Sequence, residues 1–438
     1  MAGLKRTLGL WGAAAVGIGA IIGTGIFVLI GVASGISGPA VIISFLIAGF
    51  TALLTGLSTA ELSSFITEAG GSYIYTTRAF GKFPGFVIGW MKSFDYIVGA
   101  SAVSIGFAAY FAYLVGLPPA VGTLVLVGST WPLVLMAVNL KGMKEAGGTN
   151  SVLVALKISA LVVFIVVGGW YLFTHGDLSN YHPFFPNGIA GALQGASIIF
   201  FAFIGFNTIS VIAEEVKDPE RNVPRAVLIA FAICTLLYIG VSVVAVGLLN
   251  WKLLGLSSAP LEAALRVATD NFFVLEFIAF TALVATTSVI VTSIMGGSRA
   301  LFAMARQRVI PGTFAHLSEN GIPVLTVLIT GIAIGAIVFF TGGNLDWLAS
   351  IFNFGTLVTF TFINLSLLRL RRTMPDVKRG FRVPLYPLTP VLGVLSCLLL
   401  SLYLSRNAIL VGFGWVAIGV VAYAWNRKRY RVLPVEGP

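Results

Sequence analysis

Long apolar runs separated by short polar segments dominate this sequence. A helix needs about 20 apolar residues to cross the hydrocarbon core of a bilayer, and windows of that length predict twelve membrane-spanning helices. They cover residues 8–33, 39–66, 83–115, 121–140, 151–173, 189–213, 224–249, 272–304, 323–341, 345–368, 383–404 and 408–425. The pattern therefore predicts an all-α polytopic membrane protein with one transmembrane domain over residues 1–438.

Composition supports this fold class and argues against several kinds of function. The chain is 58% hydrophobic and only 10% charged, whereas a soluble domain carries about 25% charged residues. The two cysteines, Cys234 and Cys397, both lie in apolar runs and suggest neither a disulfide framework nor a metal site. No nucleotide-binding motif and no nucleophile–base pair stands out, so we expect neither an ATP-driven pump nor an enzyme, and no cofactor.

The basic residues predict how the helices are oriented. Of the 27 Lys and Arg residues, 22 fall on the side of the membrane that carries both termini, and three, Lys252, Arg266 and Arg406, fall on the other. Lys92 and Lys157 lie within spans. Because basic loops stay in the cytoplasm, we expect both termini there, in a multi-pass protein of the cell membrane. The net charge of +11 is then a topology signal and does not indicate nucleic-acid binding.

The first predicted span contains a cluster of glycines that favours a break in the helix. Gly17, Gly19, Gly23 and Gly25 fall within nine residues, and each glycine weakens a helix by about 1 kcal/mol relative to alanine. Unwound backbone inside a membrane persists only where it lines a cavity or is buried in protein, and its free amides can bind a carboxylate. The alternative is a tight packing face of small residues.

A second candidate break lies in the sixth span, over residues 200–208, where Gly205 stands near Asn207. It begins about 180 residues after the first, and interrupted spans at matching places in two halves are typical of transporters built from inverted repeats. We therefore predict a first repeat over residues 8–173, a second over 189–368 and two additional helices over 383–425. Carbonyls freed in the second break and amides freed in the first would together bind a zwitterion.

Lys157 lies in the middle of the otherwise uncharged run 151–171. A charged side chain at the centre of a membrane helix costs about 3 kcal/mol on insertion scales, so lysines there usually face a polar cavity, bind backbone carbonyls or exchange a proton. The alternative is a side chain that extends to the membrane surface. We favour proton coupling or a structural cation role for Lys157.

Four segments carry a resemblance to a known family. They are GIGAIIGTGIF at 17–27, TAELSSFITEAGGSYIYTTRAFG at 59–81, FFAFIGFNTISVIAEEVKDPERNVPRA at 200–226 and SRALFAMARQRVIP at 298–311. Together they resemble the APC (amino acid–polyamine–organocation) superfamily, in particular its prokaryotic permeases similar to cationic amino acid transporters. The resemblance implies a five-plus-five inverted repeat with discontinuous helices 1 and 6, two extra helices, and transport by alternating access.

The same resemblance implies a substrate site at the two breaks. The residues that would take the substrate carboxylate are Ile21, Gly23, Thr24 and Gly25. The backbone carbonyls that would take its ammonium group belong to Phe201, Ala202 and Ile204, with the Phe201 ring as an aromatic gate over the site.

Lys157 matches the lysine that replaces a sodium ion in proton-coupled members of the family and contacts the backbone near Gly19. The resemblance thus implies a proton as the coupling ion and no sodium site. Thr286, Thr287 and Ser288 in the eighth span are the hydroxyl groups that we expect nearby.

Acidic residues leave the substrate class open. Asp95 in the third span aligns with an acidic residue of cationic-selective relatives, but Asn207 stands where those relatives often have an acid. Asp95 either contributes to the substrate site or forms an i,i+3 ion pair with Lys92. Glu61, near one end of the second span, either takes part in gating or pairs with a basic residue of a loop.

Together these patterns favour a secondary active transporter that carries small or medium neutral L-amino acids by proton-coupled symport. A cationic amino acid or polyamine transporter is one alternative, based on Asp95, and an obligate amino acid exchanger is another. A channel or a non-transporting sensor is the alternative from another class, but neither requires a central zwitterion site between paired helix breaks. The expected partners are an amino acid substrate and the lipid bilayer.

Overall fold

The structure, a computed structural model, describes residues 8–430 except 67, 69, 142–146, 207, 210–211, 213–215, 307–309 and 319–320. Within these residues the chain is helical, and one isolated parallel bridge joins Leu8 to Val216. Eight of the described helical segments are long and apolar enough to cross a membrane, and four shorter ones, of 10–17 residues, are also apolar. This architecture is that of a polytopic α-helical membrane protein.

The elements follow the apolar pattern of the chain. The first half forms α1 (Leu10–Ile21), η1 (Gly25–Leu29), α2 (Ile30–Ser37), η2 (Gly38–Ala40), α3 (Val41–Phe65), α4 (Ser72–Phe80), α5 (Lys82–Val115), α6 (Val121–Leu140) and α7 (Gly147–His175). The second half forms η3 (Ser179–Tyr181), α8 (Gly188–Ile199), η4 (Phe200–Phe203), α10 (Pro219–Leu248), α11 (Trp251–Leu256), α12 (Pro260–Ala268), α13 (Phe272–Arg306), η6 (Gly312–Ala315), α14 (Val324–Phe340), α15 (Leu345–Thr373), α16 (Leu388–Leu402) and α17 (Arg406–Tyr430).

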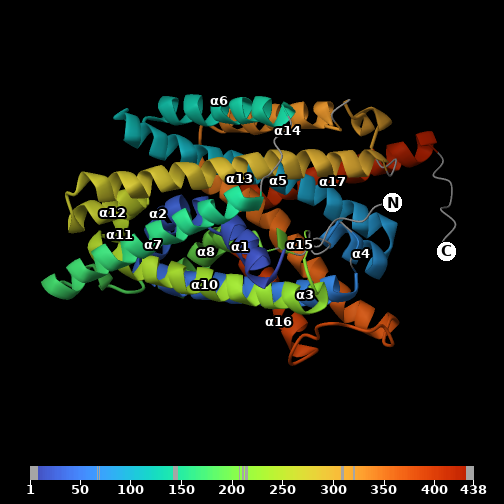
Figure 1. The fold of residues 1–438 in the computed structure, drawn as a ribbon, viewed down its shortest axis with the longest axis horizontal. Helices are drawn as coiled ribbons and strands as arrows, with labels where there is room; N and C mark the ends of the chain where they lie inside the picture. Colours follow the sequence, from blue (N-terminus) through green and yellow to red (C-terminus); the bar gives the residue numbers. More distant parts are fainter. Residues whose placement is uncertain are drawn as a thin grey trace.

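The long helices run side by side along the long axis of the molecule, with α11 and α12 near one end and α4 near the other (Figure 1). We call these the α12 end and the α4 end. Helix α5 is the most buried of the eight long segments and packs against α13, α15 and α6, whereas α10 packs along α3. Only 22% of the α6 window and 17% of the α17 window are buried, as expected of helices that face lipid.

Several helices begin or end away from the predicted spans for local reasons. Helix α10 begins at Pro219, ahead of the predicted start at residue 224, because proline suits the first turn of a helix and the polar turn that follows lies outside the apolar window. Helix α16 begins only at Leu388, since Pro384 and Pro387 lack the amides of a regular helix. The short helices α4, α11 and α12 lie outside all predicted spans.

Candidate functional site

The first predicted break comes directly after α1. Ile22 has extended backbone angles (φ −75°, ψ 104°), and the chain resumes as the π-helical turn η1 at Gly25. The next contacts are long: Ile26 N and Phe27 N lie 3.3 Å and 3.4 Å from Gly23 O. Regular α-helical bonding is therefore interrupted at residues 22–24.

The second break comes after α8. The chain tightens into the 3₁₀ turn η4 and then extends at Ile204 (φ −83°, ψ 129°). Gly205 follows with a φ of +149°, a conformation that side-chain-bearing residues rarely adopt. Glycine is required at this position by its backbone geometry.

The two breaks cross each other with backbone against backbone. A Cβ atom added to Gly25 would collide with the Cα and Cβ atoms of Ala202, and one added to Gly205 would collide with the backbone of Ala20. The small residues that predicted unwinding therefore also permit this close approach. The irregular backbone after α1 therefore lies against Ala202, and Gly205 lies against Ala20 in the last turn of α1.

Two polar side chains hold these breaks. The hydroxyl group of Tyr238, on α10, lies 2.9 Å from Ile21 O and 3.2 Å from Ala202 O, so its single proton is shared between both broken helices. Asn353 Nδ2, on α15, donates to Ser197 O at 2.7 Å and to Ile198 O at 3.0 Å, at the end of α8. Buried carbonyl groups that lose helical partners need such donors.

The predicted carboxylate-binding residues Ile21, Gly23, Thr24 and Gly25 are all buried. Among the described residues, the hydroxyl oxygen of Thr24 has no hydrogen-bond partner although it is buried. An unpaired hydroxyl group beside unwound backbone is a ready donor for a ligand. Phe201 and Ala202 are buried and Ile204 is half-buried, while Asn207 lies outside the described residues.

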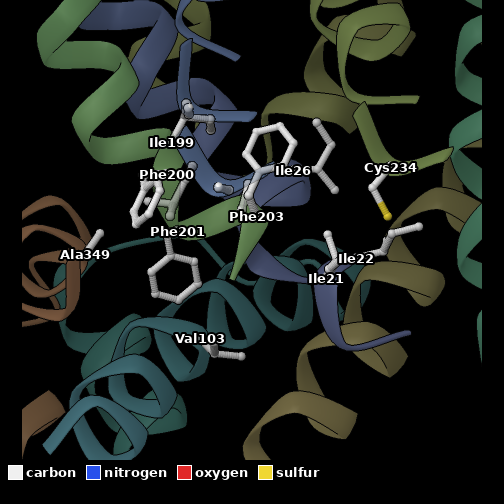
Figure 2. Close-up of a cluster of buried hydrophobic side chains, with 14 of the residues drawn as sticks. Ile21, Ile22, Ile26, Val103, Ile199, Phe200, Phe201, Phe203, Cys234 and Ala349 are labelled. Atoms are coloured by element: carbon white, nitrogen blue, oxygen red, sulfur yellow. The ribbon is translucent and has the colours of Figure 1, made fainter. Parts of the chain in front are cut away.

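The Phe201 ring projects from η4 toward α5, on the side where Val103 lies, and away from Cys234 (Figure 2). Its nearest aromatic neighbour is Phe352 on α15, at 4.6 Å between ring centroids. Both rings keep a small exposed fraction, 9% for Phe201 and 8% for Phe352. The predicted gate residue Phe201 therefore forms an aromatic pair with Phe352.

Lys157 points into the protein, with only 2% of the residue exposed. Its Nζ donates to Gly19 O at 2.8 Å, on α1 just before the break, and to Ser288 Oγ at 3.1 Å, on α13. Its ammonium group thus links α7, α1 and α13. No carboxylate of a described residue lies within ion-pair distance of it.

The two threonines beside Ser288 have other partners. Thr286 Oγ1 donates to Ala282 O at 2.8 Å within its own helix, and Thr287 Oγ1 accepts from Trp131 Nε1 at 3.3 Å. Of the three hydroxyl groups predicted near Lys157, the one that contacts it is therefore that of Ser288.

Asp95 is buried on α5, where it faces α15. Its Oδ2 accepts from Thr356 Oγ1 at 3.2 Å and lies 3.8 Å from Lys92 Nζ, which is an ion pair without a hydrogen bond. Its Oδ1 lies against Gly355 and, among the described residues, has no hydrogen-bond partner. The predicted i,i+3 pair with Lys92 is present but leaves half of this carboxylate unpaired.

The sequence profile of the amino acid permease family matches residues 8–424. The chain belongs to this family. It is 34% identical to a branched-chain amino acid permease of Bacillus subtilis and 34% identical to a methylthioribose transporter of the same species, in each case over 98% of this chain and 95% of the relative. It is also 34% identical to a vacuolar cationic amino acid transporter of Arabidopsis thaliana, over 83% of this chain and 62% of that protein. The predicted superfamily is therefore confirmed, and the chain is a transporter rather than an enzyme.

The permease also has a buried charge cluster at its α4 end. Glu61, fully buried on α3, accepts from Arg371 Nε at 2.7 Å, from Arg371 Nη2 at 2.6 Å and from Val383 N at 2.6 Å. Arg379 Nε lies 3.3 Å from the same carboxylate. Burial lowers the pKa of Arg379, and the charge of Glu61 opposes this effect. The sequence left open whether Glu61 takes part in gating or pairs with a basic residue of a loop. Its partners are Arg371 at the end of α15 and two residues of the loop that follows, Arg379 and Val383.

A smaller charge cluster lies at the α12 end of the permease. Glu262 accepts from Arg266 Nε at 2.7 Å within α12, and Arg266 Nη2 donates to the hydroxyl group of Tyr113 at 3.2 Å, on α5. The hydrogen bond to Glu262 raises the pKa of Arg266. Helices α11 and α12 also pack on α2, where the backbone of Leu254 touches Gly31. These contacts tie the short helices to the segment that follows the first break.

Sequence reasoning missed Tyr238, Asn353 and Arg371 as parts of this arrangement. Tyr238 lies in an uninterrupted apolar run far from either helix end, where tyrosine is less expected than near a membrane surface. That position was a usable signal. Asn353 is also a polar residue within a helix long enough to span, but its partners Ser197 and Ile198 are about 155 residues away and carry no mark in the sequence.

Proposed function

We propose that this permease is a proton-coupled symporter of small or medium neutral L-amino acids in the cell membrane and that it works by alternating access. The observation that carries the proposal is the crossing of two broken helices, at Gly25 and Ala202, beside a buried lysine. Amides of one break and carbonyls of the other provide complementary groups for the two charged ends of an amino acid. The proposed transporter has one domain of twelve spans in two inverted repeats plus two helices, with both termini in the cytoplasm.

In this proposal the substrate carboxylate binds the backbone of residues 21–25, together with the unpaired hydroxyl group of Thr24. The ammonium group binds the carbonyls of Phe201, Ala202 and Ile204. Phe201 O accepts one bond from Ile204 N, and Ala202 O accepts one from Tyr238. A carbonyl oxygen has two lone pairs, so each retains capacity for a substrate donor.

Proton coupling is assigned to Lys157. In its protonated form the side chain makes charge-assisted bonds, which are about twice as strong as neutral ones, and these bonds hold Gly19 on α1 against Ser288 on α13. Loss of the proton weakens that link and frees the segment before the first break to move. Substrate binding at the break and protonation of Lys157, which binds Gly19 O, then act on the same half-helix.

The preference for neutral substrates has two supports. The Phe201 ring packs on another aromatic ring, that of Phe352, and one similar protein is named a branched-chain amino acid permease. Other relatives are named for cationic amino acids or methylthioribose. Uptake and competition measurements with each class of substrate distinguish these alternatives.

The test is uptake of radiolabelled leucine, alanine and arginine into proteoliposomes, with and without an inward proton gradient. We expect gradient-stimulated uptake of leucine or alanine by the wild type and loss of that stimulation in Lys157→Met. Ser288→Ala keeps the bond to Gly19 and should retain gradient dependence with a changed pH profile. Lys82→Met, at an exposed lysine at the start of α5, is the matched control and should behave as wild type.

Each alternative has its own outcome. Uptake only into liposomes preloaded with amino acid would identify an exchanger, and symport through Lys157 would be wrong. Uptake of arginine in place of leucine would identify a cationic transporter. If methylthioribose binds to the protein and amino acids do not, the proposed zwitterion site is wrong. Unsaturable flux would indicate a channel.

A further inference from the structure

The interface between α5 and α15 has two tiers next to the candidate site. Gly99 on α5 faces Phe352 on α15, and Asp95 on α5 faces Gly355 and Thr356. The order of these pairs means that the two helices run antiparallel here. Positions 95 and 99 are one helical turn apart, so the second tier lies about 6 Å farther along the helix, toward the α4 end.

The first tier is aromatic. A Cβ atom added to Gly99 would lie 2.7 Å from Cε2 and 2.8 Å from Cδ2 of Phe352, so the ring rests directly on the backbone of α5. The centroid of the same ring lies 4.6 Å from that of Phe201, with 50° between the ring planes. Phe352 thus fills the gap between α5, α15 and the gate residue of the second break.

The second tier is the carboxylate of Asp95, which can accept a further hydrogen bond. Asp95 is 1% exposed and its Oδ1 has no hydrogen-bond partner among the described residues, while Gly355 leaves the room that this oxygen occupies. A buried carboxylate oxygen without a donor is unusual, because desolvation of such a group is costly unless it is paired. Lys92 is too distant, at 3.8 Å, to donate a hydrogen bond.

We propose that Phe352 sets the side-chain specificity of the transporter by closing the substrate pocket above Asp95. With the ring in place, the substrate side chain meets the Phe201 and Phe352 rings, and the carboxylate is out of its reach. Without the ring, a longer side chain passes along α15 to Asp95, whose unpaired oxygen accepts from a guanidinium or ammonium group. This inference rests on the proposed amino acid site and adds the residue that selects neutral over cationic substrates.

The experiment measures ligand recognition by wild type, Phe352→Ala and the double variant Phe352→Ala/Asp95→Asn. Leucine, phenylalanine and arginine are compared by inhibition of leucine uptake and by the shift in melting temperature that each gives the purified protein. Removing the ring should improve recognition of phenylalanine and arginine by about tenfold, the scale of a pocket contact. The double variant should keep the gain for phenylalanine and lose the gain for arginine.

Phe352→Leu is the conservative variant and guards against a folding defect. It should retain wild-type stability and give a smaller gain for phenylalanine. Phe413→Ala, which removes a largely exposed ring that packs against Phe354 from α17, controls for the loss of an aromatic residue and should leave the ranking of substrates unchanged.

The proposal is overturned if Phe352→Ala and Phe352→Leu rank the three amino acids as wild type does, or if the gain for arginine survives Asp95→Asn. The shifts in melting temperature test the specificity inference separately from the proposed function, because they report amino acid binding without a proton gradient. If the wild type shows no proton-coupled uptake but the Phe352 variants rank the three amino acids differently from wild type, the specificity inference still holds. The absence of any amino acid binding in wild type and variants removes both.

Discussion

At the scale of single residues, several buried side chains donate hydrogen bonds to carbonyl groups near the irregular segments. Tyr238 and Asn353 donate to carbonyls at the two breaks, and Lys157 donates to Gly19 O. The hydroxyl group of Tyr110 donates to Phe27 O at 2.7 Å, in the π-helical turn. Water is scarce inside a membrane bundle, so a carbonyl without a partner is costly there. Each of these side chains is therefore a structural requirement of the broken helices.

Tyr238→Phe tests this requirement. The change keeps the ring and removes the shared donor, so two buried carbonyls lose a partner, and we expect a loss of about 1–3 kcal/mol of stability. Unfolding of the purified protein measures it, together with weaker amino acid binding. Tyr423→Phe, whose ring stacks on Phe86, is the matched control and should have wild-type stability. Equal effects of both changes would show that the Tyr238 hydroxyl group has no special role.

Sequence alone distinguishes these residues unequally. Lys157 stood out because a charge interrupts an apolar run, and hydropathy measures that property. Tyr238 and Asn353 are only mildly polar, and the carbonyls they bind belong to residues of no distinctive type. Which backbone group lies opposite a side chain depends on packing between helices distant in sequence, and no local pattern encodes it.

At the scale of elements, the two breaks behave as one unit because Gly25 lies against the backbone of Ala202 and Gly205 lies against the last turn of α1. A cluster of glycines predicted the first break, and Gly205 together with its matching place in the second half of the chain predicted the second. Neither pattern indicated that the segments would be in direct contact, or that the first would continue as a π-helix at Gly25–Leu29.

Gly25→Ala should disrupt this unit. The added methyl group would overlap Ala202, and because the obstacle is backbone, one broken helix must move away from the other. We expect a lower melting temperature and at least a tenfold loss of uptake, since misplacement of a site by about 1 Å is enough for large losses of activity. Gly414→Ala in α17, where nothing lies within 4 Å of the new Cβ atom, should be neutral or slightly stabilising. A fully active Gly25→Ala protein would contradict the crossing described above.

At the scale of the whole molecule, the Glu61 cluster joins α3 to the end of α15 and to the loop that follows. Glu61 is 310 residues from Arg371 and 322 residues from Val383 in the sequence. The sequence marked Glu61 as a candidate but could not choose among the many basic residues of the chain, because pairing across such distances is set by the assembled bundle.

Glu61→Gln leaves Arg371 and the buried Arg379 without their counter-charge. Breaking a buried ion pair in this way typically costs about 3–5 kcal/mol, so we expect a marked loss of stability in unfolding measurements. Glu68→Gln is the control, because Glu68 pairs with Arg78 at the same end but both are exposed. Exposed pairs contribute about 0–1 kcal/mol. Comparable losses in the two variants would rule out a structural role specific to the buried cluster.

The Glu61 cluster also bears on biosynthesis. Val383, which donates to Glu61, is added 322 residues after it, and at 5–20 residues per second the ribosome needs roughly 16–64 s to cover that distance. Until the end of this interval, α3 carries a carboxylate whose set of final partners is incomplete. The nascent chain must therefore keep Glu61 hydrated or transiently paired, and the cluster forms among the last contacts of the maturing protein.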